Sequence, residues 1–209
     1  MAAEAMLPEP TSSNAIAQEI AYRICRAGLR TLGVSFKEIA PIRAEAGENP
    51  ACGIARPLRI LKAGPDLKIE GGAVMSCPTA LSLALWVRDE AQPAARMLPG
   101  APRITALLPG STYQCRPRIG DSGLSAHGRG TAFDLMGVVL SDESALMIAP
   151  RNGIGAVEEG FQKAARHGAC LYFTTVLGPG SNASHTNHLH FDTLARRAVA
   201  GCAGRWPAR

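Results

Sequence analysis

The sequence predicts an α+β fold, because helical patterns cluster early in the chain and strand-like patterns cluster late. Hydrophobic residues make up 46% of the chain, which is too many for a disordered protein. Glycine and proline are both frequent, with 22 and 15 residues, and they predict many turns. We therefore expect a loose tail over residues 1–13 and one disulfide-stapled domain over 14–209, with helices packed on a small antiparallel sheet.

The first expected helix follows the polar tail. Ser13 or Asn14 can cap its start, and it should end near Gly28 or Gly33. Isoleucines recur along it at helical spacing, which predicts one apolar face. This face carries Ile16, Ile20 and Ile24.

Two further helices and several strands are expected. Pro78 suits the first turn of one helix, and Pro93 ends or kinks it. The other helix covers 154–167 and is closed by Gly168. Short apolar runs bounded by turn residues predict strands over 58–61, 67–69, 103–108, 131–140, 170–177 and 187–191.

Charge and hydropathy exclude two classes of protein. The longest apolar stretch, 80–87, is much shorter than the roughly 18 residues of a membrane span. The net charge is +5, but the arginines are scattered rather than gathered in the stripe of a nucleic-acid binder. The mild basicity fits contact with an anionic surface or substrate, and it fits equally a solvated surface without a partner.

Six widely spaced cysteines favour disulfides and therefore an oxidising compartment. No two of them form a CxxC pair, which argues against a zinc ribbon or a thioredoxin-like site. The alternative is six buried free thiols in a cytosolic protein. Residues 1–4 start no signal peptide, so a periplasmic or secreted location requires the chain to be a processed form.

Four of the five histidines fall in two segments that can form one metal site. Asp134 shares a face of its expected strand with a glycine and an alanine, which leave that face open. His127 precedes this strand and can fold over the open face, while His188 and His190 share a face of their own strand. Two imidazoles and one carboxylate make a three-ligand zinc site whose fourth position stays open, as hydrolysis requires.

These residues resemble the lysostaphin, D-alanyl-D-alanine carboxypeptidase and hedgehog group of zinc proteins, whose pattern is SxHxxGxAxD followed by HxH or ExxH. More closely, about residues 20–203 resemble the bacterial extensin-like C-terminal domain family. The resemblance implies that His127, Asp134 and His190 bind Zn²⁺. The segments that carry the closer resemblance are 51–54 (ACGI), 77–78 (CP), 113–116 (YQCR) and 175–180 (TVLGPG).

The resemblance also suggests a catalytic base. Members with ExxH have a glutamate three residues before the last ligand, where this chain has Asn187, whose amide cannot take a proton. His188, as in the HxH members, is then the candidate that accepts a proton from water or stabilises an oxyanion. The alternative is that His188 only orients a ligand.

Three residues are candidates for substrate binding. In the resembling peptidases an arginine near Arg116 holds a substrate carboxylate or carbonyl, although a structural salt bridge is the alternative. Ser125 is the first fixed position of the motif. His185 can contact substrate or a ligand, or it can lie in a solvent-facing loop.

Resemblance and short loop lengths together suggest three disulfides, Cys25–Cys52, Cys77–Cys115 and Cys170–Cys202. In this arrangement the Cys77–Cys115 bridge would support the loop that carries Arg116.

The function that this resemblance implies is zinc-dependent hydrolysis of an amide bond in peptidoglycan peptide stems or cross-links, as a DD-endopeptidase or carboxypeptidase. The partner would be a peptidoglycan peptide, with no nucleic acid and no membrane span. The alternative is a catalytically silent, zinc-stabilised cell-wall binding or structural module.

Overall fold

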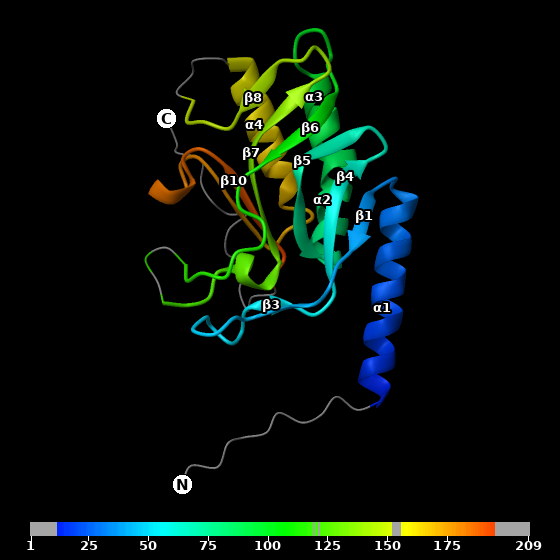
Figure 1. Ribbon diagram of the computed structural model, residues 1–209. Coiled ribbons are helices and arrows are strands. Elements are labelled where there is room, and N and C mark those ends of the chain that lie inside the picture. Colours follow the sequence, from blue (N-terminus) through cyan, green and yellow to red (C-terminus); the bar gives the residue numbers. More distant parts are fainter. Residues whose placement is uncertain (1–11, 119, 121, 152–155, 195–209) are drawn as a thin grey trace.

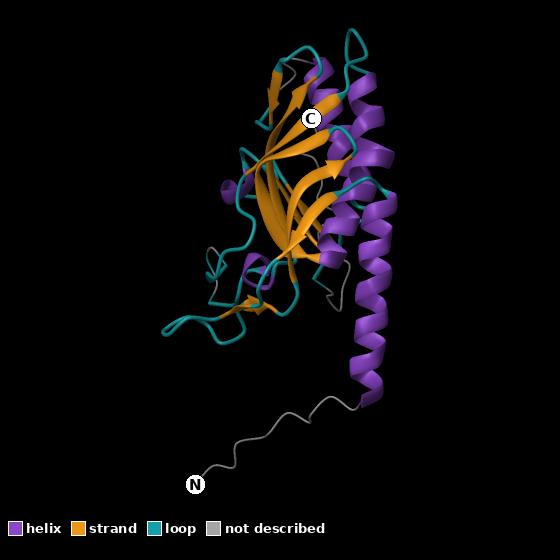
Figure 2. Ribbon diagram, turned by 45° about the vertical axis from the view of Figure 1, so that its right-hand side comes forward, coloured by secondary structure: helices purple, strands orange, loops and turns teal. Residues whose placement is uncertain are grey.

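The computed structural model of the chain describes residues 12–118, 120, 122–151 and 156–194 (Figure 1). Nearly all of the expected tail, residues 1–11, lies outside them. The α-helices gather on one face of a curved sheet (Figure 2), so the chain has the expected α+β layering. Among the described residues, no helix combines the length and the hydrophobicity needed to cross a membrane.

The sheet is larger than expected, and it is mixed rather than antiparallel. Its eight strands run in the order β1-β4-β5-β6-β7-β10-β9, with β8 paired to β7. The β5–β6 pair is parallel, because the chain leaves β5 through a helical segment and returns alongside it. The bounds are β1 Ser35–Glu38, β4 Pro57–Gly64, β5 Leu67–Ser76, β6 Ile104–Pro109, β7 Ala132–Leu140, β8 Ala145–Met147, β9 Thr175–Leu177 and β10 Leu189–Asp192.

Strands β4, β5, β6, β7 and β10 confirm five of the expected strands. The strand predicted over 170–177 is wrong in its first half. Residues 170–173 instead form the turn that ends the preceding helix, where the Cys170 N–H donates to the His167 carbonyl at 3.1 Å. Strands β1 and β8 were not expected, and neither was the separate pair of β2 (Ile42–Arg43) and β3 (Gly53–Ile54).

The β5–β6 crossover is the helix expected at Pro78. Helix α2 (Cys77–Trp86) begins after Ser76, whose hydroxyl accepts from the Thr79 N–H. A π-helical turn, η1 (Val87–Ala91), follows, and α3 (Gln92–Arg96) carries Pro93 in its first turn. Proline is tolerated there because a first-turn N–H has no intrahelical partner. Pro93 therefore follows a π-helical turn but does not end the helical segment, which continues to Arg96.

Helix α4 (Ala156–Ala169) runs past the glycine that was expected to close it. A Cβ at Gly168 would lie 2.4 Å from a carboxylate oxygen of Glu90, so this glycine permits close packing on η1. Behind it, the Trp86 indole N–H donates to the Ala165 carbonyl at 2.9 Å, and the Trp86 ring lies 4.8 Å from that of Phe191. The core therefore joins α2 and α4 to the inner face of β10.

Helix α1 (Ser12–Thr31) forms where it was expected, and its isoleucine face is exposed to solvent. Ile16, Ile20 and Ile24 are 60%, 53% and 66% exposed, while Cys25 and Leu29 are buried. Cys25 and Leu29 lie on the other side of the helix, and this side packs on α2. The first half of α1 also extends beyond the end of the sheet (Figure 1).

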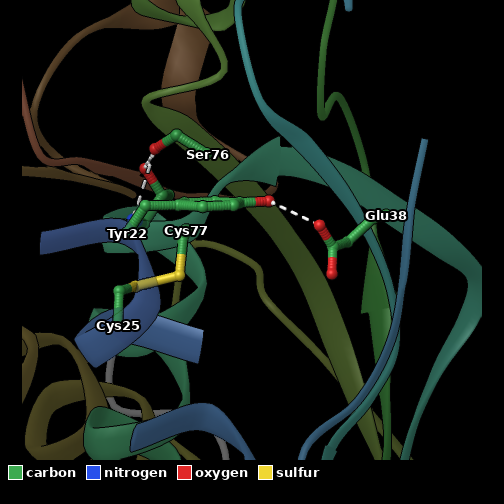
Figure 3. Close-up of a disulfide and its surroundings, with 6 residues drawn as sticks. Tyr22, Cys25, Glu38, Ser76 and Cys77 are labelled. Atoms are coloured by element: carbon green, nitrogen blue, oxygen red, sulfur yellow. Dashed lines mark hydrogen bonds between the residues drawn. A yellow bond between two sulfur atoms is a disulfide. The ribbon is translucent and has the colours of Figure 1, made fainter. Parts of the chain in front are cut away.

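Both disulfides that the structure describes differ from the expected pairing. Cys25 joins Cys77 and Cys52 joins Cys115. The first bridge follows from the packing of α1 on the start of α2 (Figure 3), which places two cysteines side by side that are 52 residues apart in sequence. Cys170 is also disulfide-bonded, and its expected partner Cys202 lies outside the described residues.

Replacing both Cys25 and Cys77 by alanine should lower the free energy of unfolding by about 4 kcal/mol, because the bridge restricts a long loop in the unfolded chain. Urea unfolding measures this loss. Peptide mapping without reductant should recover Cys25 linked to Cys77. A fragment that links Cys25 to Cys52 would contradict the structure.

Candidate metal centre

The pairing of β7 with β10 places Asp134 directly opposite His190. Directly paired residues of antiparallel strands project from the same face, so both side chains lie on the face away from the core. Both are buried. Two residues distant in the sequence therefore meet through sheet register alone.

A short 3₁₀ turn, η2 (Ala126–Arg129), supplies His127. The Ser125 hydroxyl caps this turn by accepting from the His127 N–H at 3.4 Å. The turn ends at Gly130, whose φ is +63°, and a Cβ there would lie 2.1 Å from Cδ1 of Ile54. Only glycine fits this conformation and this space, so the Gly130 position fixes the direction from which His127 approaches.

Three ligand atoms converge at one point. His127 Nε2 lies 3.2 Å from His190 Nδ1 and 3.3 Å from Asp134 Oδ1, and His190 Nδ1 lies 2.8 Å from Asp134 Oδ1. Ligands at 2.0–2.1 Å from a tetrahedral zinc ion lie about 3.3 Å from one another. The two edges that include His127 match this spacing, and the edge between His190 and Asp134 is shorter. These residues form a group that could hold a metal ion.

The main chain selects the tautomer of His127. Its Nδ1 lies 2.7 Å from the Thr112 carbonyl oxygen, which can only accept, so Nδ1 carries the hydrogen. The other ring nitrogen, Nε2, is directed at Asp134 and His190, and it is the nitrogen available to a metal. A histidine that donates one nitrogen to a carbonyl and offers the other is the usual arrangement of a metal ligand.

Asp134 is kept ionised. Burial raises the pKa of its carboxyl, but hydrogen bonds from His127 and His190 outweigh burial and hold the pKa well below its ordinary value. A buried carboxylate between two imidazoles suits a divalent cation, because it supplies a negative charge that imidazole ligands do not.

His188 and His185 lie beside the three ligands. His188 Nε2 is 3.7 Å from Asp134 Oδ1, and its Nδ1 is 3.0 Å from the Asn187 amide oxygen. Burial lowers the pKa of His188 from its ordinary value, against the attraction of Asp134, so the ring is neutral near pH 7. Burial and the neighbouring histidines lower the pKa of His185 to about 4.

The sequence matches the family model described as Extensin-like protein C-terminus over residues 23–203. The chain belongs to this family. No curated protein and no solved structure matches it.

In this extensin-like chain, the ligand group opens into a cavity of about 420 Å³. Arg116, Ser125 and His185, the expected substrate-binding residues, all line it. Arg116 forms no salt bridge with any described carboxylate, and its Nε donates to the Gln114 amide oxygen at 3.1 Å. The Ser125 hydroxyl is engaged by the cap of η2, and His185 Nδ1 lies 2.6 Å from Asn182 Oδ1.

Sequence reasoning missed three contributors to this extensin-like site. Thr112 acts through its carbonyl, which no side-chain pattern reveals. Arg118 lines the cavity two residues after Arg116, a spacing that could have indicated it. Thr175 also lines the cavity and is 6% exposed, yet its hydroxyl has no hydrogen-bond partner among the described residues.

Replacing Thr175 by valine, which has nearly the same shape, should raise the free energy of unfolding by about 1–3 kcal/mol, because a buried unpaired hydroxyl is removed. Urea unfolding of the metal-free protein measures the change. Thr174→Val is the matched control: its hydroxyl lies 2.9 Å from the Asp192 carbonyl oxygen, so this variant should lose stability. A less stable Thr175→Val protein would show that the hydroxyl is paired.

Proposed function

We propose that this protein is a zinc-dependent hydrolase that cleaves an amide bond in peptidoglycan peptide stems or cross-links. The observation that carries the proposal is the triangle of His127, Asp134 and His190 ligand atoms at the base of a cavity, with a neutral histidine beside it. The chain's family membership does not name a reaction, so the proposal rests on this geometry and on the motif's resemblance to zinc peptidases.

The donor set suits zinc, since it combines two imidazole nitrogens with one carboxylate oxygen. When bound, zinc supplies Lewis-acid chemistry, which polarises a carbonyl group and makes water more acidic. The protein's part is to hold the ligands: Thr112 orients His127, and sheet pairing orients Asp134 toward His190.

His188 is the proposed base. Asn187 Oδ1 accepts from Nδ1–H of His188, which leaves Nε2 unprotonated and directed at the ligand group. A neutral imidazole at this place can take a proton from water and pass it to the leaving amine. The lowered pKa keeps the ring in that form at neutral pH.

Arg116 is the proposed anchor for substrate. Peptide stems carry carboxylates, and a guanidinium at the cavity wall can bind a carboxylate or a carbonyl oxygen through two parallel N–H groups. Arg116 bonds with the uncharged side chain of Gln114 and not with a described carboxylate. Its positive charge is therefore available to an anionic ligand.

The proposed location is periplasmic or secreted. Support comes from two disulfides, Cys25–Cys77 and Cys52–Cys115, which persist in an oxidising compartment and are rare in the cytosol. Peptidoglycan peptides are accessible from the same compartment.

Asp134→Ala should weaken zinc binding by at least about 100-fold, because it removes the only charged ligand, whereas losing even an outer-shell partner costs about 10- to 100-fold. Competitive titration with a chelating dye measures the affinity. Asp142→Ala is the control: within the described parts of the chain this exposed aspartate bonds with Ser144 in the β7–β8 turn, so its loss should leave the affinity unchanged. Equal affinity in both variants would rule out the proposed ligand.

His188→Ala should keep zinc but lower turnover of purified peptidoglycan by roughly 10²- to 10⁴-fold, because proton transfer is lost. His190→Ala should lose both zinc and activity. Product masses and metal content are measured together, with the exposed His167→Ala on α4 as a control. Normal turnover in His188→Ala would remove its role as base.

If the unmodified zinc-loaded protein releases no product from peptidoglycan or stem peptides, the silent binding or structural module becomes the better account.

A further inference from the structure

Helix α1 presents an apolar face to solvent on the side away from the rest of the molecule. Ile16, Ile20 and Ile24 recur every four residues, so they lie along one side of the helix. Each is more than half exposed. The buried side, with Cys25 and Leu29, lies on the opposite half of the helix circumference. Figures 1 and 2 both show the first half of α1 standing clear of the sheet.

The charges around this isoleucine face are mainly positive. Arg23 and Arg30 lie on α1 beside the face and are exposed. Glu19 pairs with Arg23 at 2.7 Å and with Arg56 at 2.6 Å, and Arg26 pairs with Glu38. The helix and its charged contacts therefore hold two more arginines than glutamates, on a chain whose net charge is +5.

We propose that α1 docks on an anionic lipid surface, with Ile16, Ile20 and Ile24 inserted at the level of the headgroups. A helix with an apolar face and flanking arginines binds in this way through buried apolar area and attraction to anionic lipid. The helix would lie in the plane of the surface without spanning it.

A second copy of the chain is the weaker candidate for covering this face. A stable protein–protein interface buries about 800 Å² on each partner, and three isoleucines on one isolated helix provide much less. Lipid binding needs no such area, because shallow insertion is strengthened by the arginines.

The full-length chain is tested by sedimentation with vesicles of phosphatidylglycerol and phosphatidylcholine, against vesicles of phosphatidylcholine alone. We expect binding to the anionic vesicles, and weaker binding at high salt. The variant Ile20→Gln/Ile24→Gln should partition about 100-fold more weakly, since each isoleucine that leaves the lipid costs roughly a factor of ten. Glutamine favours helix, so α1 should remain folded, which circular dichroism checks.

Leu171→Gln is the matched control, because Leu171 is 74% exposed and lies after α4 rather than on α1. Its partitioning should equal that of the unmodified protein. Equal partitioning of the double variant, or no binding of the unmodified protein to anionic vesicles, would overturn the proposal. A dimer in analytical ultracentrifugation that the double variant abolishes would instead assign the face to a second copy. Because the assay requires neither zinc nor turnover, its outcome is independent of the proposed hydrolase activity.

Discussion

The candidate metal centre depends on the register between β7 and β10. A slip of one residue would direct Leu189 into the cavity and His190 into the core. The core prevents this slip, because the residues alternating with the ligands are apolar and almost completely inaccessible to solvent, namely Phe133, Leu135, Leu189 and Phe191. Because the Trp86 ring contacts Phe191, the position of β10 also depends on how α2 packs against the sheet. The geometry of the polar face is thus set by packing on the opposite face of the sheet.

Two disulfides also stabilise the structure around the candidate metal centre. Cys52–Cys115 ties the segment before β3 to the loop that carries Arg116. A Cβ at Gly128 would lie 3.2 Å from Cys52 Sγ, so the bridge also packs directly beneath η2. Across the molecule, Cys25–Cys77 holds α1 to α2, and the Gly130 carbonyl accepts from the Ser76 N–H at the start of α2.

Local patterns predicted the parts of the fold that depend on local chemistry. Alternation along 131–140 predicted both the strand and the open face around Asp134, and Pro78 located α2. Local patterns could not predict contacts between residues that are far apart in the sequence. Periodicity identified the isoleucine face of α1 but could not show that α1 packs on α2 through its opposite side. The cysteine pairing failed for the same reason, since the packing of α1 on α2 places Cys25 beside Cys77 rather than Cys52.

The bond from His127 to the Thr112 carbonyl has a consequence for how this site tolerates sequence change. Because the acceptor belongs to the main chain, most side chains could replace Thr112 without disturbing the imidazole. An insertion or deletion between Gly110, whose N–H donates to the Asp134 carbonyl, and Thr112 would move the acceptor itself. The Thr112 position should therefore accept many amino acids, while the loop that carries it accepts only one length.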